Sequence, residues 1–154
     1  MNKRSPLPQS ETASDLAAQI RMMLSRLKRR LREQGGREDL TLSQISVLLR
    51  LEKGGAATVS GLARAEGMRP QSMSSIVVSL QDAGLVGSSS DPNDGRQTLM
   101  SLSKRCEKLL RETRAARQDW LTNTILQKLS AQEQQQLSIT LELLNRLTED
   151  GPLS

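Results

Sequence analysis

One segment of the sequence departs from the three- and four-residue spacing of apolar residues that marks most of the chain. It is GLVGSSSDPNDGRQTLMSLS, residues 84–103, and it holds a run of turn-forming residues, Asp-Pro-Asn-Asp-Gly, at 91–95. Proline, asparagine, aspartate and glycine each favour tight turns, so two short strands on either side should form a hairpin. The chain is therefore predicted to be mainly α-helical with one small β-hairpin.

Six helices are predicted around this hairpin, over residues 14–34, 41–53, 59–65, 70–82, 103–128 and from 130 toward the C-terminus. Most show apolar residues that return to one face, as the period of an α-helix requires. Thr41 with Gln44, and Ser130 with Glu133, have the capping-box spacing that starts a helix. In the second helix, the residues expected to face inward are Ile45, Leu48, Leu49 and Leu51.

Composition limits both the core and the chemistry. The 154 residues include one Trp, no Phe or Tyr, one Cys and no His, so the core must be aliphatic. An internal disulfide, a histidine-based zinc site and a histidine base are excluded. We also find no glycine-rich phosphate loop and no nucleophile paired with a base. The sequence therefore predicts a protein that is not an enzyme and has no cofactor or metal site.

The charge balance favours a polyanionic partner. The net charge is +5, and residues 20–37 carry seven Arg or Lys against one Glu. This balance suits nucleic acid, although it is not specific to it. No apolar run approaches the roughly 20 residues of a membrane span, and the N-terminus lacks the apolar stretch of a signal peptide. We expect a cytoplasmic protein that does not enter membranes, with residues 1–13 as a disordered tail.

Residues 59–82 have a helix-turn-helix pattern, in which two short helices are joined by a turn that contains Gly67. The second helix places apolar residues on one side and small polar residues on the other. Serine is a poor helix former, so its frequent use on this face indicates that short side chains are needed there for a partner to approach. The major groove of DNA is such a partner. A merely solvated face is the alternative. The candidate DNA-binding residues here are Arg69, Gln71, Ser72, Ser74, Ser75, Val78 and Ser79.

A helix-turn-helix followed directly by a two-stranded ribbon is a winged helix. Its second helix would enter the major groove, and the ribbon would reach the backbone or the adjacent minor groove. Arg96 is the candidate inserted cation, which the negative potential of a narrow minor groove favours. Asp94 is expected to hold the guanidinium of Arg96 through a bidentate ion pair. An ordinary turn ion pair of little energetic value is the alternative.

With these elements, the sequence resembles the MarR family of bacterial transcription regulators over roughly residues 14–148. The resemblance is densest in LTLSQISVLLRL, GLARAEGMRPQSMSSIVVSLQDAGLV and DPNDGRQTLMSLS. Its most specific parts are Asp94-Gly95-Arg96 and Leu102-Ser103, where the family usually has Leu-Thr. The resemblance implies a homodimeric repressor that binds a pseudo-palindromic site on double-stranded DNA. It also implies that a small-molecule effector or an oxidant releases the DNA.

The resemblance further divides the chain into two lobes. Residues 39–102 would form the winged helix-turn-helix lobe, and residues 14–36 with 103–150 a helical dimerisation lobe. The residues themselves also favour a dimer, because a short chain cannot easily bury the apolar stripes of its first and last helices within one winged helix. Packing of these helices within one chain is the alternative.

Three departures from the family pattern bear on function. Gly95 and Gly87 stand where the family often has basic residues, which favours weaker DNA binding and leaves open a winged-helix scaffold that binds protein partners. Cys106 replaces a usual glycine, and it is either a redox sensor or, on its apolar stripe, a buried inert thiol. The family often binds phenolic acids between its lobes. Here Arg21, Arg26 or Arg29 could hold the carboxylate of such an effector and Trp120 could contact its ring, and a solvated basic face is the alternative.

Overall fold

The computed structural model describes residues 9–36 and 39–151 of the chain. In these residues it contains six helices and one hairpin, as the sequence predicts, so the mainly α fold with a small β-hairpin is confirmed. The elements are α1 (Gln9–Arg32), α2 (Leu42–Gly54), α3 (Val59–Glu66), α4 (Pro70–Asp82), β1 (Val86–Ser90), β2 (Thr98–Leu102), α5 (Lys104–Lys128) and α6 (Ala131–Arg146).

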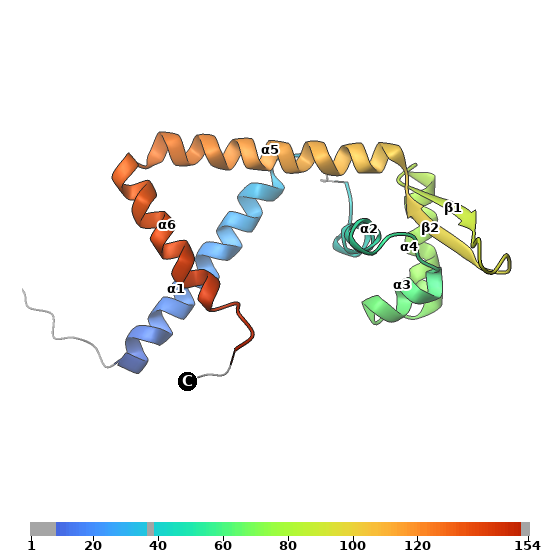
Figure 1. Ribbon diagram of the computed structural model, residues 1–154, viewed down its shortest axis with the longest axis horizontal. Helices are drawn as coiled ribbons and strands as arrows, with labels where there is room; N and C mark the ends of the chain where they lie inside the picture. The colour runs from blue at the N-terminus through green and yellow to red at the C-terminus, as the bar shows by residue number, and fades with distance from the viewer. Residues whose placement is uncertain (1–8, 37–38, 152–154) are drawn as a thin grey trace, which may run out of the picture.

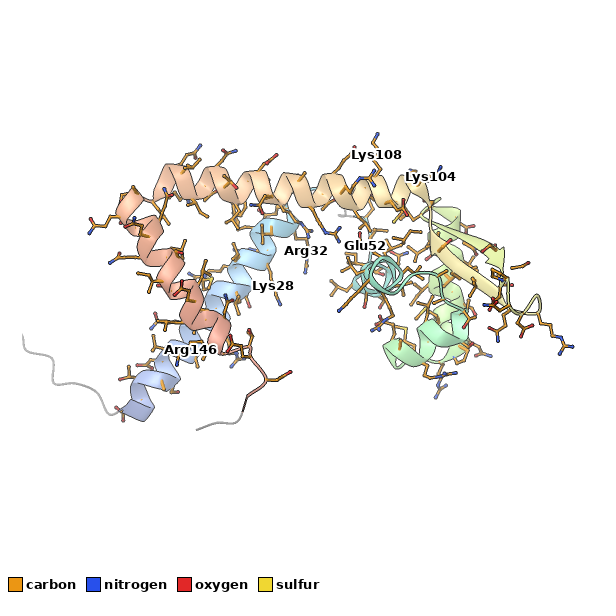
Figure 2. The ribbon with its side chains drawn as sticks, in the orientation of Figure 1. Lys28, Arg32, Glu52, Lys104, Lys108 and Arg146 are labelled. Carbon is orange, nitrogen blue, oxygen red and sulfur yellow. The ribbon has the colours of Figure 1, made fainter. Side chains whose placement is uncertain are left out.

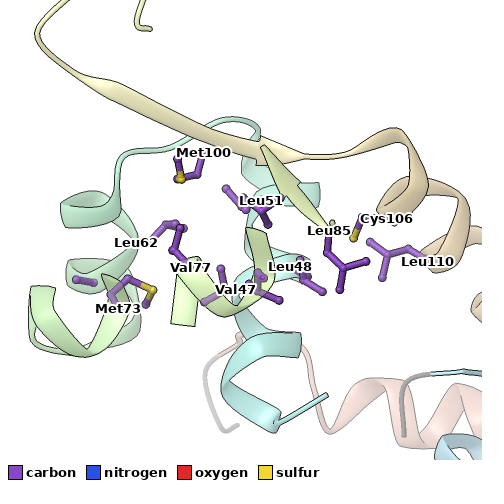
Figure 3. Packing of buried hydrophobic residues seen from close by; sticks show 13 residues of the cluster. Val47, Leu48, Leu51, Leu62, Met73, Val77, Leu85, Met100, Cys106 and Leu110 are labelled. Atoms are coloured by element: carbon purple, nitrogen blue, oxygen red, sulfur yellow. The ribbon is translucent and has the colours of Figure 1, made fainter. Parts of the chain in front are cut away.

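The molecule has two lobes joined by the long helix α5 (Figure 1). The winged lobe contains α2, α3, α4 and the hairpin, which lie together at the N-terminal end of α5. The helical lobe contains α1, α6 and the C-terminal half of α5, which enclose an open triangle (Figure 1). The core lies in the winged lobe and the first turns of α5, and Figure 3 shows its packing.

The core is aliphatic, as a chain without Phe or Tyr requires. Its buried members come from α2, α3, α4, both strands and the start of α5, and Cys106 and Leu110 fix α5 to the winged lobe. They are Val47, Leu48, Leu51, Leu62, Ala63, Met73, Val77, Leu80, Leu85, Val86, Met100, Cys106 and Leu110. By contrast, α6 has no buried residue, and the described side chains of α1 are exposed or half-buried.

Side-chain caps set the helix boundaries. Both predicted capping boxes form, at Thr41 with Gln44 and at Ser130 with Glu133. Ser103 caps α5 by accepting from the backbone N–H of Cys106 at 3.1 Å. An N-cap of this kind stabilises a helix by about 1 kcal/mol. After α4 the chain turns through Gly84, whose φ of 71° is in the left-handed region that favours glycine.

The first helix begins earlier than the sequence suggested. Residues 9–13, expected in a disordered tail, belong to α1, while residues 1–8 lie outside the described part of the chain. Glu11 lies in the first turn, where a negative side chain interacts favourably with the helix dipole. This interaction favours extension of the helix beyond the expected start at Ser14.

The inward face of α2 was only partly predicted. Leu48 and Leu51 are buried, but Leu49 is 37% exposed and Val47, which the prediction missed, is fully buried. The helix carries two pairs of apolar residues with a spacing of four. Ile45 and Leu49 form one stripe, and Val47 and Leu51 form the other. The second stripe packs in the core, and periodicity alone does not distinguish the two.

The hairpin is anchored at its base and exposed at its tip. β1 and β2 pair antiparallel, with Val86 opposite Leu102 and Ser90 opposite Thr98. Met100 also pairs with Ala57 in the segment before α3 through two backbone hydrogen bonds of 3.0 and 2.7 Å. Val86 and Met100 are buried, whereas residues 92–98 are exposed. The wing therefore projects from a fixed base.

Candidate nucleic-acid interface

Helix α4 presents two different faces. Met73, Val77 and Leu80 are buried in the core, as expected from the helical projection. The opposite face carries small polar side chains, and Val78 on that face is 53% exposed. An exposed branched apolar residue among serines suits contact with a thymine methyl group. The predicted DNA-binding residues that are exposed on α4 are Gln71, Ser72, Ser74, Ser75 and Val78.

Ser79 differs from these residues. It is half-buried, and its hydroxyl donates to the carbonyl of Ile76 at 2.6 Å and accepts from Nε2 of Gln44 at 2.9 Å. The sequence placed Ser79 beside the exposed face because projection shows the angle of a residue but not its neighbours. The hydroxyl is thus engaged within the protein, unlike the freely exposed DNA contact that the sequence suggested.

The entry to α4 is open to solvent. Gly67, with a φ of 64°, turns the chain between α3 and α4, and Pro70 occupies the first turn. Arg69 is the N-cap residue, and its side chain makes no capping bond. The residue is exposed at the start of the helix. A helix N-terminus with an adjacent cation is a suitable environment for a phosphate group.

The wing tip is shaped by aspartate side chains. Asp91 Oδ1 accepts from the backbone N–H of Asn93 at 2.9 Å, and Asp94 Oδ1 accepts from that of Arg96 at 3.1 Å. The ion pairs of the described residues do not include Asp94 with Arg96, so the expected bidentate pair is wrong. Two residues apart in a turn, the short carboxylate reaches the backbone N–H instead. Asp94 thus shapes the loop, and the Arg96 side chain is exposed.

The C-terminal end of α4 is tied to α5. Arg105 Nη1 donates to the carbonyl of Ala83 at 2.7 Å, and Ser103 Oγ donates to that of Gly84 at 2.7 Å. These bonds satisfy carbonyl groups at the end of the helix, where a cation also interacts favourably with the helix dipole. The position of α4 is therefore coupled to the first turn of α5.

Two ion pairs connect α2 to neighbouring helices, one to α3 and one to α5. Glu66 of α3 accepts from Arg50 Nε at 2.8 Å and from the Ser46 hydroxyl at 2.9 Å, and these bonds lower the pKa of Glu66. Glu52 pairs with both terminal nitrogens of Arg114 on α5, and this pair raises the pKa of Arg114. Figure 2 shows Glu52 on the side of α2 that faces α5, while Lys104 and Lys108 lie on the opposite face of α5.

Two of the predicted effector residues, Arg21 and Trp120, lie on different helices. Arg21 is exposed on α1, whereas Trp120 on α5 has the guanidinium of Arg30 5.7 Å from its ring centre. Arg21 lies nine residues before Arg30, or about 14 Å along a helix. A different groove, of about 600 Å³, lies between the end of α1 and the start of α2. It is lined by Arg29, Arg32, Glu33, Leu40, Thr41, Leu42 and Ile45.

Cys106 is fully buried in the core. Within residues 9–36 and 39–151, no group of acidic or cysteine side chains could hold a metal ion. In the same residues, no helix combines the length and the apolar character that crossing a membrane requires.

Comparison with known proteins identifies the class to which this lobe belongs. The profile of the MarR family matches residues 40–98, which contain α2, α3, α4 and β1. HTH-type transcriptional regulators of Mycobacterium bovis and Mycobacterium tuberculosis are each 36% identical over 137 residues, which covers 89% of this chain and 95% of theirs.

Solved structures agree with this result. A candidate transcriptional regulator from Pseudomonas aeruginosa PA01 has a TM-score of 0.76 and 32% identity, and covers 95% of this chain and 100% of its own. A MepR mutant of S. aureus, solved bound to an oligodeoxyribonucleotide, shares the fold with a TM-score of 0.70 and 20% identity, over 87% of this chain and 98% of its own. The chain therefore belongs to the MarR family of transcriptional regulators.

Proposed function

We propose that this protein is a sequence-specific repressor that binds double-stranded DNA as a homodimer. Helix α4 enters the major groove, where Gln71, Ser75 and Val78 reach base edges, and Arg69 contacts a phosphate. The wing places Arg96 at the backbone or in the adjacent minor groove. One observation carries this proposal. The exposed face of α4 consists of small and mostly uncharged side chains, and the wing of the same lobe has an exposed arginine, Arg96.

Unburied apolar side chains support the homodimer. The large apolar residues of the helical lobe that remain exposed include Leu16, Met22, Leu126, Ile139 and Leu143, at 53–63% exposed. Residues of α1 and α6 also line an apolar groove of about 720 Å³. A second copy that covers these faces would form an interface like a domain core cut in half. Two winged lobes would then contact half-sites about 10–10.5 base pairs apart.

Repression released by a small molecule is the third part of the proposal. The groove between α1 and α2 supports it, because Arg29 and Arg32 at one side can pair with a carboxylate and Leu40, Leu42 and Ile45 can contact an apolar body. It opens onto the start of α2, in the lobe that carries α4.

The test is fluorescence anisotropy of the full chain on DNA from upstream of its own gene and on a scrambled duplex, over a salt series. Selective binding whose log K falls by roughly 0.9 per log salt for each neutralised phosphate is expected. The Arg96→Ala variant should weaken binding to both duplexes and reduce this slope by about one. Gln71→Ala should instead relax preference at one position of each half-site, by about 1–3 kcal/mol.

A second candidate function follows from two glycines. Gly87 and Gly95 leave the wing without further cations, which favours a winged-helix scaffold for protein partners with weak or no DNA binding. A binding constant that does not change with salt, equal on both duplexes, would support this candidate and contradict the repressor.

A further inference from the structure

The side chain of Gln44 is held through both atoms of its amide. Oε1 accepts from the backbone N–H of Thr41 at 2.9 Å, and Nε2 donates to Oγ of Ser79 at 2.9 Å. The N–H of Thr41 can only donate, so the amide oxygen must face Thr41 and the amide nitrogen must face Ser79. The Ser79 hydroxyl then donates to the carbonyl of Ile76 at 2.6 Å. One hydrogen-bonded chain thus runs from the start of α2 into α4.

A comparison with the second capping box of the protein shows which hydrogen bond of Gln44 is not needed for capping. At the start of α6, Glu133 accepts from the backbone N–H of Ser130 at 2.7 Å, so a carboxylate is sufficient for the capping contact. A carboxylate has no N–H to donate to a neighbouring helix, whereas the glutamine amide has two. Gln44 therefore does more than cap α2, because its free N–H group fixes a residue 35 positions away on α4.

This hydrogen bond adds a directional restraint to the apolar contacts of the core. Met73, Val77 and Leu80 hold α4 through apolar contacts, which are not directional. Arg105 and Ser103 bind carbonyl groups that follow the C-terminal end of the helix. The Gln44–Ser79 bond lies at the border between the buried and exposed faces, so it resists rotation of α4 about its own axis.

We propose that Gln44 is a positioning residue for DNA recognition. It fixes the rotation of α4, and so determines which base edges Gln71, Ser75 and Val78 meet, without itself touching DNA. The hydroxyl of Ser79 accepts the hydrogen bond through which Gln44 does so. The proposal rests on the proposed function, since α4 is taken there as the helix that reads the major groove.

A double-mutant cycle tests it, with Ser79→Ala, Gln44→Met and the double variant measured on the preferred duplex and on duplexes changed at each half-site position. Each single change should weaken binding to the preferred duplex roughly three- to tenfold, the value of one hydrogen bond. The double variant should lose no more than either single one, and the loss of base preference should extend over several positions.

Additive losses in the cycle, with the effect of Ser79→Ala confined to one position, would overturn the proposal, because Ser79 would then contact DNA itself. Glu133→Met is the matched control, since it removes the same half of a capping box far from α4. It should leave base preference unchanged. If it alters preference as Gln44→Met does, loss of a capping box explains the result and the proposal is overturned.

Hydrogen exchange in the free protein separates failure of this proposal from failure of the proposed function. Ser79→Ala and Gln44→Met should each accelerate exchange of backbone amides in α4, whereas Glu133→Met should not. Unchanged exchange in α4 would overturn the positioning role even if the wild-type protein binds DNA tightly. If exchange is accelerated in the two variants but the wild-type protein binds no duplex, the contact still holds α4, while its role in recognition is overturned together with the proposed function.

Discussion

The two lobes bury apolar surface in different ways. The winged lobe builds an aliphatic core from α2, α3, α4, the hairpin and the start of α5 within one chain. The helical lobe is also rich in leucine and methionine, yet α6 buries none of its leucine side chains. The winged lobe therefore has a core of its own, while the helical lobe leaves apolar faces open that the proposed homodimer would cover. The predictions below test that difference, from the largest expected effect to the smallest.

The largest effect is expected in the winged core. Leu48→Ala removes a side chain that is 1% exposed and leaves a cavity, so the free energy of unfolding should fall by about 2–5 kcal/mol. The matched control is Leu42→Ala in the same helix, where the side chain is 68% exposed and the loss should be about 0.5 kcal/mol or less. Urea unfolding followed by circular dichroism measures both. Equal losses would contradict the packing of α2 described here.

The next effect concerns the helical lobe. Leu143→Glu places a charge on the apolar face of α6, at a side chain that is 54% exposed in the single chain. If a second copy covers that face, the charge must be desolvated, and dimerisation should weaken by roughly 2 kcal/mol or more. Light scattering should show the mass falling from twice 17.0 kDa toward 17.0 kDa.

The control for this variant is Ser138→Glu, which adds the same charge to the exposed opposite face of α6. It should leave the mass at the dimer value. A wild-type chain that is monomeric at micromolar concentration would remove the contrast between the lobes, because the helical lobe would then be stable without a partner.

A smaller effect concerns the ion pair within the winged lobe. The Arg50 guanidinium and the Ser46 hydroxyl lower the pKa of Glu66, so this carboxylate stabilises the fold above the pKa it has when unfolded. The contribution is lost as the pH falls through the lower folded pKa. Arg50 is half exposed, so the difference in unfolding free energy between wild type and Glu66→Gln should be about 1 kcal/mol or less near pH 7.

That difference should shrink below about pH 4, as Glu66 becomes protonated in the wild type. Unfolding curves collected between about pH 3 and pH 7 measure this difference. A difference that grows toward low pH would show that the carboxylate is unfavourable in the fold, contrary to its hydrogen bonds.

The smallest effect is a gain at the wing. At Gly95 an added Cβ would meet no atom within 4 Å, and its φ is not positive, so the fold accommodates a larger side chain. Gly95→Arg should tighten DNA binding by a few-fold and steepen the salt dependence by roughly 0.9 in log K per log salt. Gly95→Gln is the uncharged control. A steeper slope with glutamine as well would show that charge is not the cause.

The helices were predictable because their signals are local. Thr41 with Gln44 and Ser130 with Glu133 lie within single turns, and the turn residues at 91–95 define the hairpin without reference to the rest of the chain. The exposed face of α4 follows from the same periodicity, whereas the division into two lobes was implied only by the resemblance to the MarR family. These features needed no information about distant contacts.

The site was less predictable because its details depend on partners far apart in sequence. Gln44 meets Ser79 across 35 positions and Arg114 meets Glu52 across 62, so neither pair has a local signal. The apolar stripe of α2 was misjudged for the same reason, since only the neighbouring helices decide which of its two stripes is buried. The prediction for Asp94 was wrong for a local reason. Its carboxylate accepts from the backbone N–H of Arg96, which lies nearer than the guanidinium of the same residue.

Helix α5 has a mechanical consequence for this molecule. Its 25 residues extend about 37 Å at 1.5 Å per residue, and Cys106 and Leu110 embed one end in the winged lobe. Such a rigid lever turns a tilt of about 5° at one end into a displacement of roughly 3 Å at the other. That distance is close to the 3.4 Å spacing of successive base pairs. In the proposed homodimer on DNA, a slight angular change where the two chains meet would thus move each winged lobe by about the height of one base pair.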